Sequence, residues 1–502
     1  MKTILVGALA LYAPYVALAS ADPTTSWADA AEVAKVEAEL GLPRPLALAA
    51  SWDRELVRRS YVVLGARLAQ QGQRAAQAPS LEVLRDPRRG DAAANFGEDP
   101  FLTGELGVAA VLGLQPQVAA LVGPFAGPSL PGGDLGPMPV APRELREVFM
   151  APFDTVIQHA APAAVLLADN ALDGLPSTAN PALVRILKQE WNFKGAVLAT
   201  PAGARGLEER YRSSAAPLGD AWNLPANGAV QLTTENPAKQ AAREAVVLLK
   251  NDGGLLPLTR KMQVLRIDDA SPAALGKLKA PKPPYVLVLS GKLPVPSEAL
   301  TNLVEHASAV LAGLELGAEG SAALDDALAG RINPGGKLPF SLARNAGQLP
   351  MFYNVKPTAW RGYLFDTTKP LYPFGWGLSY THFEVGAPVL TKANARIGEP
   401  LLVSVEVRNT GKRAGDEVVQ IYLHHLTSST AQAVKQLVAF ERVANLAAGE
   451  ARKLDFKIEA AQLAVWNEAM QRVQEAGELE LMSGSNSVVG LKSTVVKIEE
   501  KQ

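Results

Sequence analysis

The side chains that could do chemistry in this sequence are mainly carboxylates. The 502 residues include 50 Asp and Glu, five His and no Cys. Without Cys there are no disulfides, no thiolate metal ligands and no thiol nucleophiles. No two His residues have the spacing of a zinc motif, so we expect no metal site. The adjacent His424 and His425 follow a strand-like run, and we expect them on opposite faces of a strand.

One carboxylate follows a buried strand directly. Asp169 comes after the apolar run Ala163–Ala168, which is typical of a strand covered on both faces. Enzymes built on strand–helix barrels place their catalytic groups at the carboxyl ends of the strands. Asp169 is therefore a candidate catalytic carboxylate, and a solvated surface Asp is the alternative interpretation.

The elements that would position Asp169 belong to a strand–helix region over residues 22–233. Four apolar runs predict buried strands: Leu81–Leu84, Val118–Val122, Ala163–Ala168 and Ala196–Thr200. Pro142–Phe149 and Pro181–Leu187 have helical spacing and begin with Pro, which suits a first helical turn. A closed eight-stranded barrel needs twice as many strands and about 250 residues. We therefore predict an α/β multidomain protein that begins with an incomplete TIM-like (β/α) barrel.

Two more domains are expected after the barrel region. Residues 234–345 combine the helical pattern Ala241–Lys250 with the strand-like run Tyr285–Ser290, which predicts an α/β sandwich domain. Residues 346–380 form a linker rich in Pro and aromatic residues. In residues 381–502 the apolar Val403, Val405 and Val407 alternate with polar residues, which predicts an antiparallel β-sandwich.

Charge and the first residues indicate where the protein works. The formal net charge of −1 argues against a nucleic-acid partner. Lys2, the apolar stretch Ile4–Ala19 and the small residues Ala19–Ala21 predict a signal peptide over residues 1–21. No other stretch is long and apolar enough to span a membrane. We expect export to the periplasm or the cell exterior.

Several motifs, in chain order, resemble glycoside hydrolase family 3. They are Asn95–Glu105, Glu190–Gly195, Ala241–Leu258, Asn333–Pro339 with Tyr372–Tyr380, and Val405–Phe440. The resemblance covers nearly the whole chain after the signal peptide. It implies a barrel, an α/β sandwich and a fibronectin type III-like domain. It also implies retaining hydrolysis of terminal β-linked sugars, as in β-glucosidases and β-xylosidases, without a cofactor.

The resemblance also places substitutions at the functional positions. Thr200 occupies the position of the nucleophile Asp, although retaining cleavage needs two carboxyl groups about 5–5.5 Å apart. Gly123 and Pro124 stand where the family has a sugar-contacting Lys-His pair, and Asp91 replaces a sugar-binding Arg. The segment between Leu258 and Pro284 contains no Glu that could be the acid/base.

The aromatic residues kept in the motifs offer another function. Phe125, Trp191 and Trp376 could stack on sugar rings, and packing in the core is the alternative for each. We therefore expect a family 3-like protein that is catalytically impaired or a pseudoenzyme. Two hypotheses stay open: an active retaining β-glycosidase that uses another carboxylate, Asp169 first, and a non-catalytic module that binds carbohydrate or a partner. A second copy of the chain or another protein would then cover the incomplete barrel.

Overall fold

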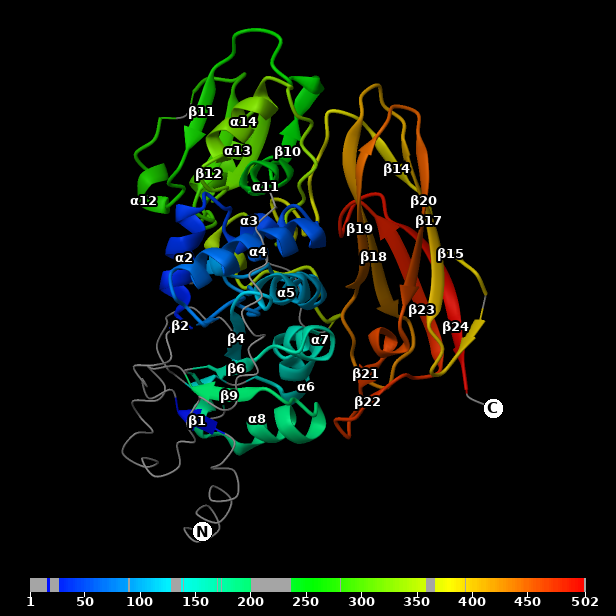
Figure 1. Cartoon of the computed structure of the whole chain (residues 1–502). Helices are drawn as coiled ribbons and strands as arrows, with labels where there is room; N and C mark the ends of the chain where they lie inside the picture. Colours follow the sequence, from blue (N-terminus) through cyan, green and yellow to red (C-terminus); the bar gives the residue numbers. More distant parts are fainter. Residues whose placement is uncertain are drawn as a thin grey trace. The chain divides into compact units, whose positions relative to one another are not determined.

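The computed structural model describes residues 16–18, 27–88, 91–127, 137–138, 140–168, 170–172, 174–199, 236–279, 281–357, 366–392 and 394–500. The chain divides into two compact units. Figure 1 labels the helices and strands of both units. The first unit comprises Met1–Pro45, Arg54–Leu84 and Arg89–Ala238. The second unit comprises Leu46–Asp53, Arg85–Arg88 and Lys239–Gln502.

The first unit is built on a curled, half-barrel sheet. Its strand order is β1-β9-β6-β4-β3-β2, and all neighbouring strands are parallel. The strands are Val16–Leu18 (β1), Trp27–Ala28 (β2), Ala75–Ala76 (β3), Ala119–Phe125 (β4), Ala164–Leu167 (β6) and Ala196–Ala199 (β9). A small sheet joins Pro137–Met138 (β5), Ala171–Leu172 (β7) and Leu175–Pro176 (β8). The prediction of an incomplete barrel is confirmed.

Helices of the first unit pack closely because glycines face their neighbours. They are Ala30–Glu39 (α2), Arg54–Gln70 (α4), Pro100–Leu114 (α5), Pro142–Glu144 (α6), Ala151–Ala160 (α7) and Pro181–Arg185 (α8). A side chain at Gly113 of α5 would lie 2.3 Å from the Arg58 carbonyl oxygen of α4. Helices α6 and α8 begin with the predicted Pro, and each continues as a π-helical turn, Leu145–Phe149 and Ile186–Glu190.

Two sequence predictions are wrong in detail. Leu81–Leu84 is not a strand: the Leu81 N–H donates to the Gly123 carbonyl, whereas the Leu84 N–H turns away to Gly97. This run is buried as a loop, so burial alone explains its apolar side chains. The helix predicted over Ala241–Lys250 ends early, because Val247–Asn251 forms a strand (β10). A short run made mostly of apolar residues has no periodicity that could distinguish a helix from a strand.

The second unit contains the predicted α/β sandwich. Its sheet has the order β10-β13-β12-β11, with only β10 antiparallel to its neighbour. The other strands are Val264–Ile267 (β11), Val286–Gly291 (β12) and Ala309–Leu314 (β13). The helices are Pro45–Ala49 (α3), which begins one residue before this unit, Ala238–Glu244 (α11), Pro272–Leu275 (α12), Glu298–His306 (α13) and Gly320–Leu328 (α14).

The same unit ends in the predicted β-sandwich. One sheet joins Phe383–Val385 (β14), Val389–Leu390 (β15), Leu401–Asn409 (β17) and Ala451–Ile458 (β20). The other joins Asn394–Arg396 (β16), Gly415–His425 (β18), Gln436–Leu446 (β19), Gly477–Gly484 (β23) and Lys492–Glu499 (β24), and a hairpin pairs Val465–Trp466 (β21) with Arg472–Val473 (β22). The alternating Val403, Val405 and Val407 point into a core shared by both sheets. His424 and His425 end β18, as expected of a strand.

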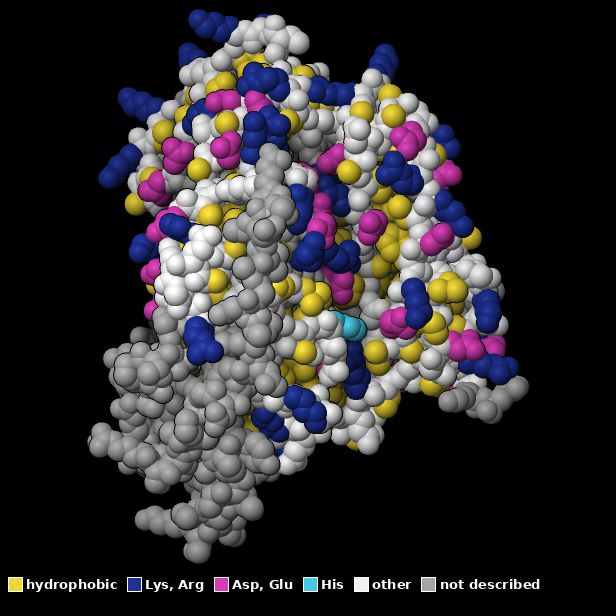
Figure 2. Space-filling view, viewed as in Figure 1, with side chains coloured by type: hydrophobic (Ala, Val, Ile, Leu, Met, Phe, Trp, Pro, Cys, Tyr) yellow, Lys and Arg dark blue, Asp and Glu magenta, His cyan; other side chains and the backbone are white. Residues whose placement is uncertain are grey.

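Short 3₁₀ helices complete the described structure. They are Ala92–Ala94, Ser177–Ala179, Asp252–Gly254, Ala346–Gln348 and Ala460–Leu463. Of the predicted signal peptide only Val16–Leu18 is described, and it forms β1 beside β9. None of the described helices is long and apolar enough to cross a membrane. On the face shown in Figure 2, basic and acidic side chains are interspersed, in line with the near-zero net charge.

Candidate functional site

The end of β4 carries two of the predicted sugar-contact positions. Gly123 lies against β6 so closely that an added Cβ would be 2.7 Å from the Leu166 Cβ and 3.1 Å from the Leu166 carbonyl oxygen. Two residues after β4, a Cβ on Gly127 would lie 2.5 Å from the Ala168 Cβ. Position 123 therefore has no room for a long cationic side chain unless the strands shift, and Pro124 brings no charge.

Trp191, predicted to stack on sugar, is part of an aromatic cluster. Its ring packs edge-to-face against the Phe125 ring at a centroid distance of 5.7 Å. The Phe125 ring also packs edge-to-face against Phe153, at 5.1 Å. Phe125 and Phe153 are buried, whereas Trp191 is half-buried. The geometry supports a packing role for Phe125 and Trp191.

Asp91, at the position of the sugar-binding Arg, has its own cationic partner. Its two carboxylate oxygens accept hydrogen bonds from Arg44 Nη2 at 3.1 and 3.3 Å. Arg44 Nη1 also donates to the buried Glu37 at 2.6 Å. The Asp91 side chain is 64% exposed. The reversed charge is thus paired within the unit, with Arg44 shared between Asp91 and Glu37.

Two predicted catalytic positions remain, together with two carboxylates of the motif Asn95–Glu105. Thr200 and Asp169 lie outside the described residues. Glu98 and Asp99 are buried, and the Asp99 carboxylate accepts from the Leu102 N–H at 2.7 Å, which caps the first turn of α5. Asp99 is therefore a capping residue. Among the described residues no group of three or more His, Asp or Glu could hold a metal ion.

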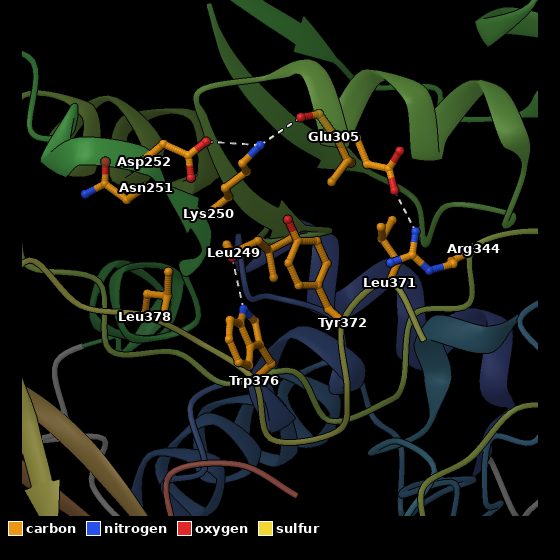
Figure 3. A pocket seen from close by; sticks show the side chains of 11 residues that line it. Leu249, Lys250, Asn251, Asp252, Glu305, Arg344, Leu371, Tyr372, Trp376 and Leu378 are labelled. Carbon is orange, nitrogen blue, oxygen red and sulfur yellow. Dashed lines mark hydrogen bonds and ion pairs between the residues drawn. The ribbon is translucent and has the colours of Figure 1, made fainter. Parts of the chain in front are cut away.

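A pocket that sequence reasoning missed lies in the second unit. It has a volume of about 390 Å³ and is lined by the end of β10, the end of α13 and the linker (Figure 3). Lys250 Nζ pairs with Asp252 at 3.2 Å and donates to the Glu305 carbonyl oxygen at 2.8 Å. Arg344 Nη1 pairs with the Glu305 carboxylate at 2.6 Å. Both cations of the pocket therefore already have an anionic partner.

Two aromatic rings form the opposite side of this pocket. Tyr372 and Trp376 stack at a centroid distance of 6.1 Å with 29° between their planes. Trp376 Nε1 donates to the Leu249 carbonyl oxygen at 2.9 Å, which fixes the indole (Figure 3). Trp376, Lys250 and Asp252 lie in motifs that the sequence singles out, but Glu305 and Arg344 carry no sequence signal.

Comparison with known proteins identifies the family. Residues 32–219 match the family model of the glycosyl hydrolase family 3 N terminal domain, and residues 262–380 match that of its C-terminal domain. Residues 417–487 match a fibronectin type III-like domain. The chain belongs to glycosyl hydrolase family 3.

Relatives in family 3 are similar over most of their length. A periplasmic β-glucosidase of Salmonella typhimurium is 27% identical, with 89% of this chain and 83% of the relative aligned. A β-xylosidase of Formosa agariphila is 24% identical, with 89% and 86% aligned. A β-glucosidase of Listeria innocua in complex with glucose has a TM-score of 0.79 at 25% identity, covering 91% of this chain and 86% of that one.

The alignment with the Salmonella family member reveals missing segments. It extends over 639 positions, more than the 502 residues of this chain. Relatives in the family therefore carry internal segments that this chain lacks. This agrees with the half-barrel sheet of the first unit.

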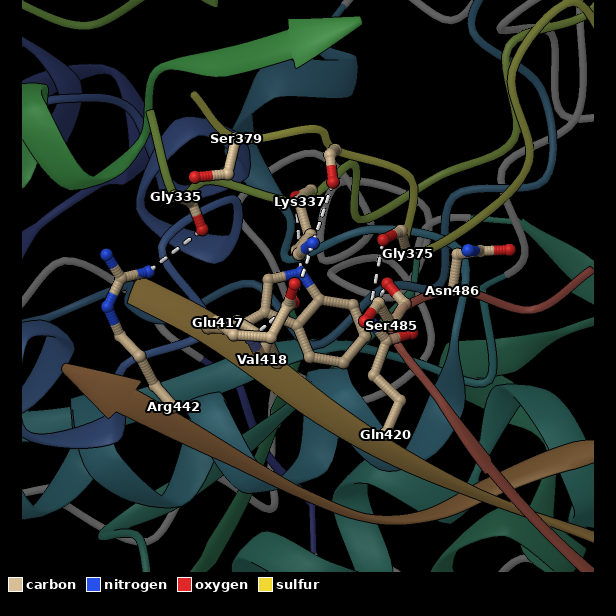
Figure 4. Close-up of polar contacts among 12 residues, drawn as sticks. Gly335, Lys337, Gly375, Ser379, Glu417, Val418, Gln420, Arg442, Ser485 and Asn486 are labelled. Atoms are coloured by element: carbon tan, nitrogen blue, oxygen red, sulfur yellow. Dashed lines mark hydrogen bonds and ion pairs between the residues drawn. The ribbon is translucent and has the colours of Figure 1, made fainter. Parts of the chain in front are cut away.

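The family motifs Asn333–Pro339 and Tyr372–Tyr380 have a structural role in the second unit (Figure 4). Lys337, in the motif Asn333–Pro339, is 2% exposed, and its Nζ lies 2.7 Å from Glu417 of β18. The same Nζ donates to the Gly377 carbonyl oxygen at 2.7 Å, and Trp52 Nε1 donates to the Lys337 carbonyl oxygen at 3.1 Å. We call the pair Lys337–Glu417 the clamp.

A second contact holds the motif Tyr372–Tyr380. Gln420 Nε2 donates to the carbonyl oxygens of Gly375, at 3.3 Å, and Ser485, at 2.8 Å. Gly375 has φ +77°, and a Cβ there would lie 2.1 Å from Gln420 Oε1, so only Gly fits. Ser379 donates to Asn333 at 2.9 Å. These contacts join the two motifs to the β-sandwich.

Proposed function

We propose that this chain is a family 3 member that has lost glycoside hydrolysis and keeps the family frame to bind carbohydrate. The observation that carries the proposal is the packing at Gly123. The resemblance implies a sugar-contacting Lys at this position. Here the space that a side chain at position 123 would need is occupied by Leu166. The relatives named as β-glucosidases and β-xylosidases indicate terminal β-linked sugars as the ligand class.

The chemistry of retaining cleavage supports the same proposal. The transition state resembles an oxocarbenium ion and needs a carboxylate nucleophile and an acid/base. Thr200, at the nucleophile position, has a neutral hydroxyl that attacks poorly without a base. Asp91 pairs with Arg44 and presents no cation to a sugar hydroxyl. Each loss alone would slow the reaction, and together they remove every charged group of the expected constellation.

Hydrolysis of aryl β-glucoside and aryl β-xyloside by the purified protein tests the proposal. An activated leaving group needs little acid assistance, so this assay favours even a damaged site. We expect a rate equal to that of a blank without enzyme. Turnover well above the blank would overturn the proposal and direct attention to another carboxylate, Asp169 first.

The variant Thr200→Asp separates loss of the nucleophile from loss of the whole site. We expect it to remain inactive, because Gly123 and Pro124 still provide no sugar contact. A Thr200→Asn variant, of the same size but without the charge, is the matched control. Activity in Thr200→Asp alone would show that only the nucleophile is missing.

We also propose export and a covered half-barrel. The sequence of the first residues supports cleavage after Ala21, which N-terminal sequencing of the secreted protein would test. An open parallel sheet leaves edges that need a cover, so a second copy of the chain or another protein is expected there. Light scattering of the purified protein measures its oligomeric state, and a monomer without partners would contradict the second proposal.

A further inference from the structure

We propose that the pocket between Lys250, Glu305 and Tyr372 in the second unit is a binding site for a neutral saccharide of one or two rings. The site consists of the end of β10, the end of α13 and the linker, and it shares no residue with the strand ends of the half-barrel. The inference goes beyond the proposed loss of hydrolysis and stands whether or not the chain hydrolyses glycosides.

The aromatic side of the pocket fits the apolar face of a sugar ring. Saccharides present C–H groups on one face and hydroxyls around the edge, so their sites pair an aromatic ring with convergent polar groups. Trp376 is half-buried and its indole is fixed by Leu249. Tyr372 lies beside it, and its hydroxyl points to the side where Lys250 and Glu305 lie (Figure 3).

The Tyr372 hydroxyl is an unused hydrogen-bonding group in a buried side chain. Tyr372 is 8% exposed, and within the described part of the chain its hydroxyl has no hydrogen-bond partner. Burial, together with the charge of Asp252, holds the pKa of Tyr372 well above its usual range, so the hydroxyl stays protonated and can donate. A ligand hydroxyl in the pocket could therefore accept a hydrogen bond from Tyr372.

The charges of the pocket select a neutral ligand. Lys250 is paired with Asp252, and Arg344 is paired with Glu305. An anionic ligand would meet the carboxylates of both pairs, and a cationic ligand would meet the ammonium and guanidinium groups. A saccharide hydroxyl can donate to a carboxylate and accept from a cation at once, so it fits beside an ion pair.

The size of the pocket limits the ligand. Its volume of about 390 Å³ lies near the lower end of the range for small-molecule sites, about 300–1,000 Å³. That space suits one or two sugar rings.

Saturation-transfer NMR and calorimetry on the full chain test the inference. The probes are glucose, xylose, cellobiose and xylobiose, with glucose 6-phosphate as an anionic comparison. We expect at least one neutral probe to bind and the phosphate to bind more weakly. Tyr372→Phe removes only the hydroxyl and should weaken binding about 2- to 10-fold. Tyr380→Phe is the matched control, because its hydroxyl donates to Ala327 outside the pocket.

The outcomes separate this inference from the proposed function. Equal affinities of Tyr372→Phe and the parent protein would overturn the pocket assignment and leave the proposed carbohydrate binding in place. Failure of all four neutral probes to bind would overturn both the pocket assignment and the proposed carbohydrate binding. Hydrolysis of aryl glycosides would overturn the proposed function and leave the pocket untouched. Glu305→Gln gives a second measurement, because it breaks the ion pair with Arg344 and should also weaken binding several-fold. Circular dichroism confirms that each variant is folded.

Discussion

Replacing Glu417 by Gln tests whether the clamp holds the second unit together. Both side chains of the pair are nearly inaccessible, at 2% for Lys337 and 5% for Glu417. The substitution leaves the ammonium group of Lys337 buried without a carboxylate beside it, although it still donates to the Gly377 carbonyl oxygen at 2.7 Å. Removing one member of a buried ion pair typically costs about 3–5 kcal/mol. With a urea dependence of about 3 kcal/mol per molar, the unfolding midpoint should fall by about 1 M or more.

Urea unfolding followed by Trp fluorescence measures this shift. Trp52 is a suitable probe because it packs on Phe374 and Phe440 in the same unit, at centroid distances of 5.3 and 5.2 Å. Glu384→Gln removes an exposed partner of Lys492 and should leave the midpoint unchanged. A Glu417→Gln shift no larger than that of the control would refute the reasoning.

Three further outcomes are expected. Burial lowers the pKa of His425 to about 4 from 6.5, so its contribution to stability is present above pH 6.5 and is lost as the pH falls towards 4. Between pH 7 and pH 5, urea titrations should therefore show that the free energy of unfolding falls by about 2 kcal/mol. The same fall should occur in His424→Gln and be absent in His425→Gln. Gly123→Ala should cost about 1–3 kcal/mol through overpacking against Leu166, measured as a lower melting temperature of the first unit. Asp99→Ala should lower the stability of the first unit by about 0.5–2 kcal/mol because the cap of α5 is lost. Asp99→Asn should keep most of the capping stability when measured in the same thermal unfolding experiment.

The β-sandwich was predictable in more detail than the parallel sheets. Along β17, Val403, Val405 and Val407 alternate with polar residues because one face of the strand is solvated, so the period reveals the strand. Strands buried on both faces lack this contrast. That is why Val247–Asn251 resembled a helix and Leu81–Leu84 resembled a strand, although the first is β10 and the second is a loop.

The candidate site was predictable only where a motif carried it. The resemblance located Gly123 and Asp91. No sequence pattern shows that Leu166 fills the space beside Gly123 or that Arg44 pairs with Asp91. These partners come from other strands and helices, at sequence separations that spacing rules do not reach. The pocket was missed for the same reason, since Lys250 and Glu305 meet only after β10 and α13 fold.

The contacts of the linker connect stability to binding within the second unit. Gln420 holds the Gly375 carbonyl, and Lys337 holds the Gly377 carbonyl, so the backbone is fixed on both sides of Trp376. The motif Tyr372–Tyr380 therefore presents the ring of Trp376 to the pocket in a preset position. Binding to a preset site avoids part of the ordering cost that a mobile side chain would add. It follows that Glu417→Gln, at urea concentrations where the unit is still folded, should weaken saccharide binding even though Glu417 does not line the pocket. Unchanged affinity in that variant would mean that the clamp contributes stability alone.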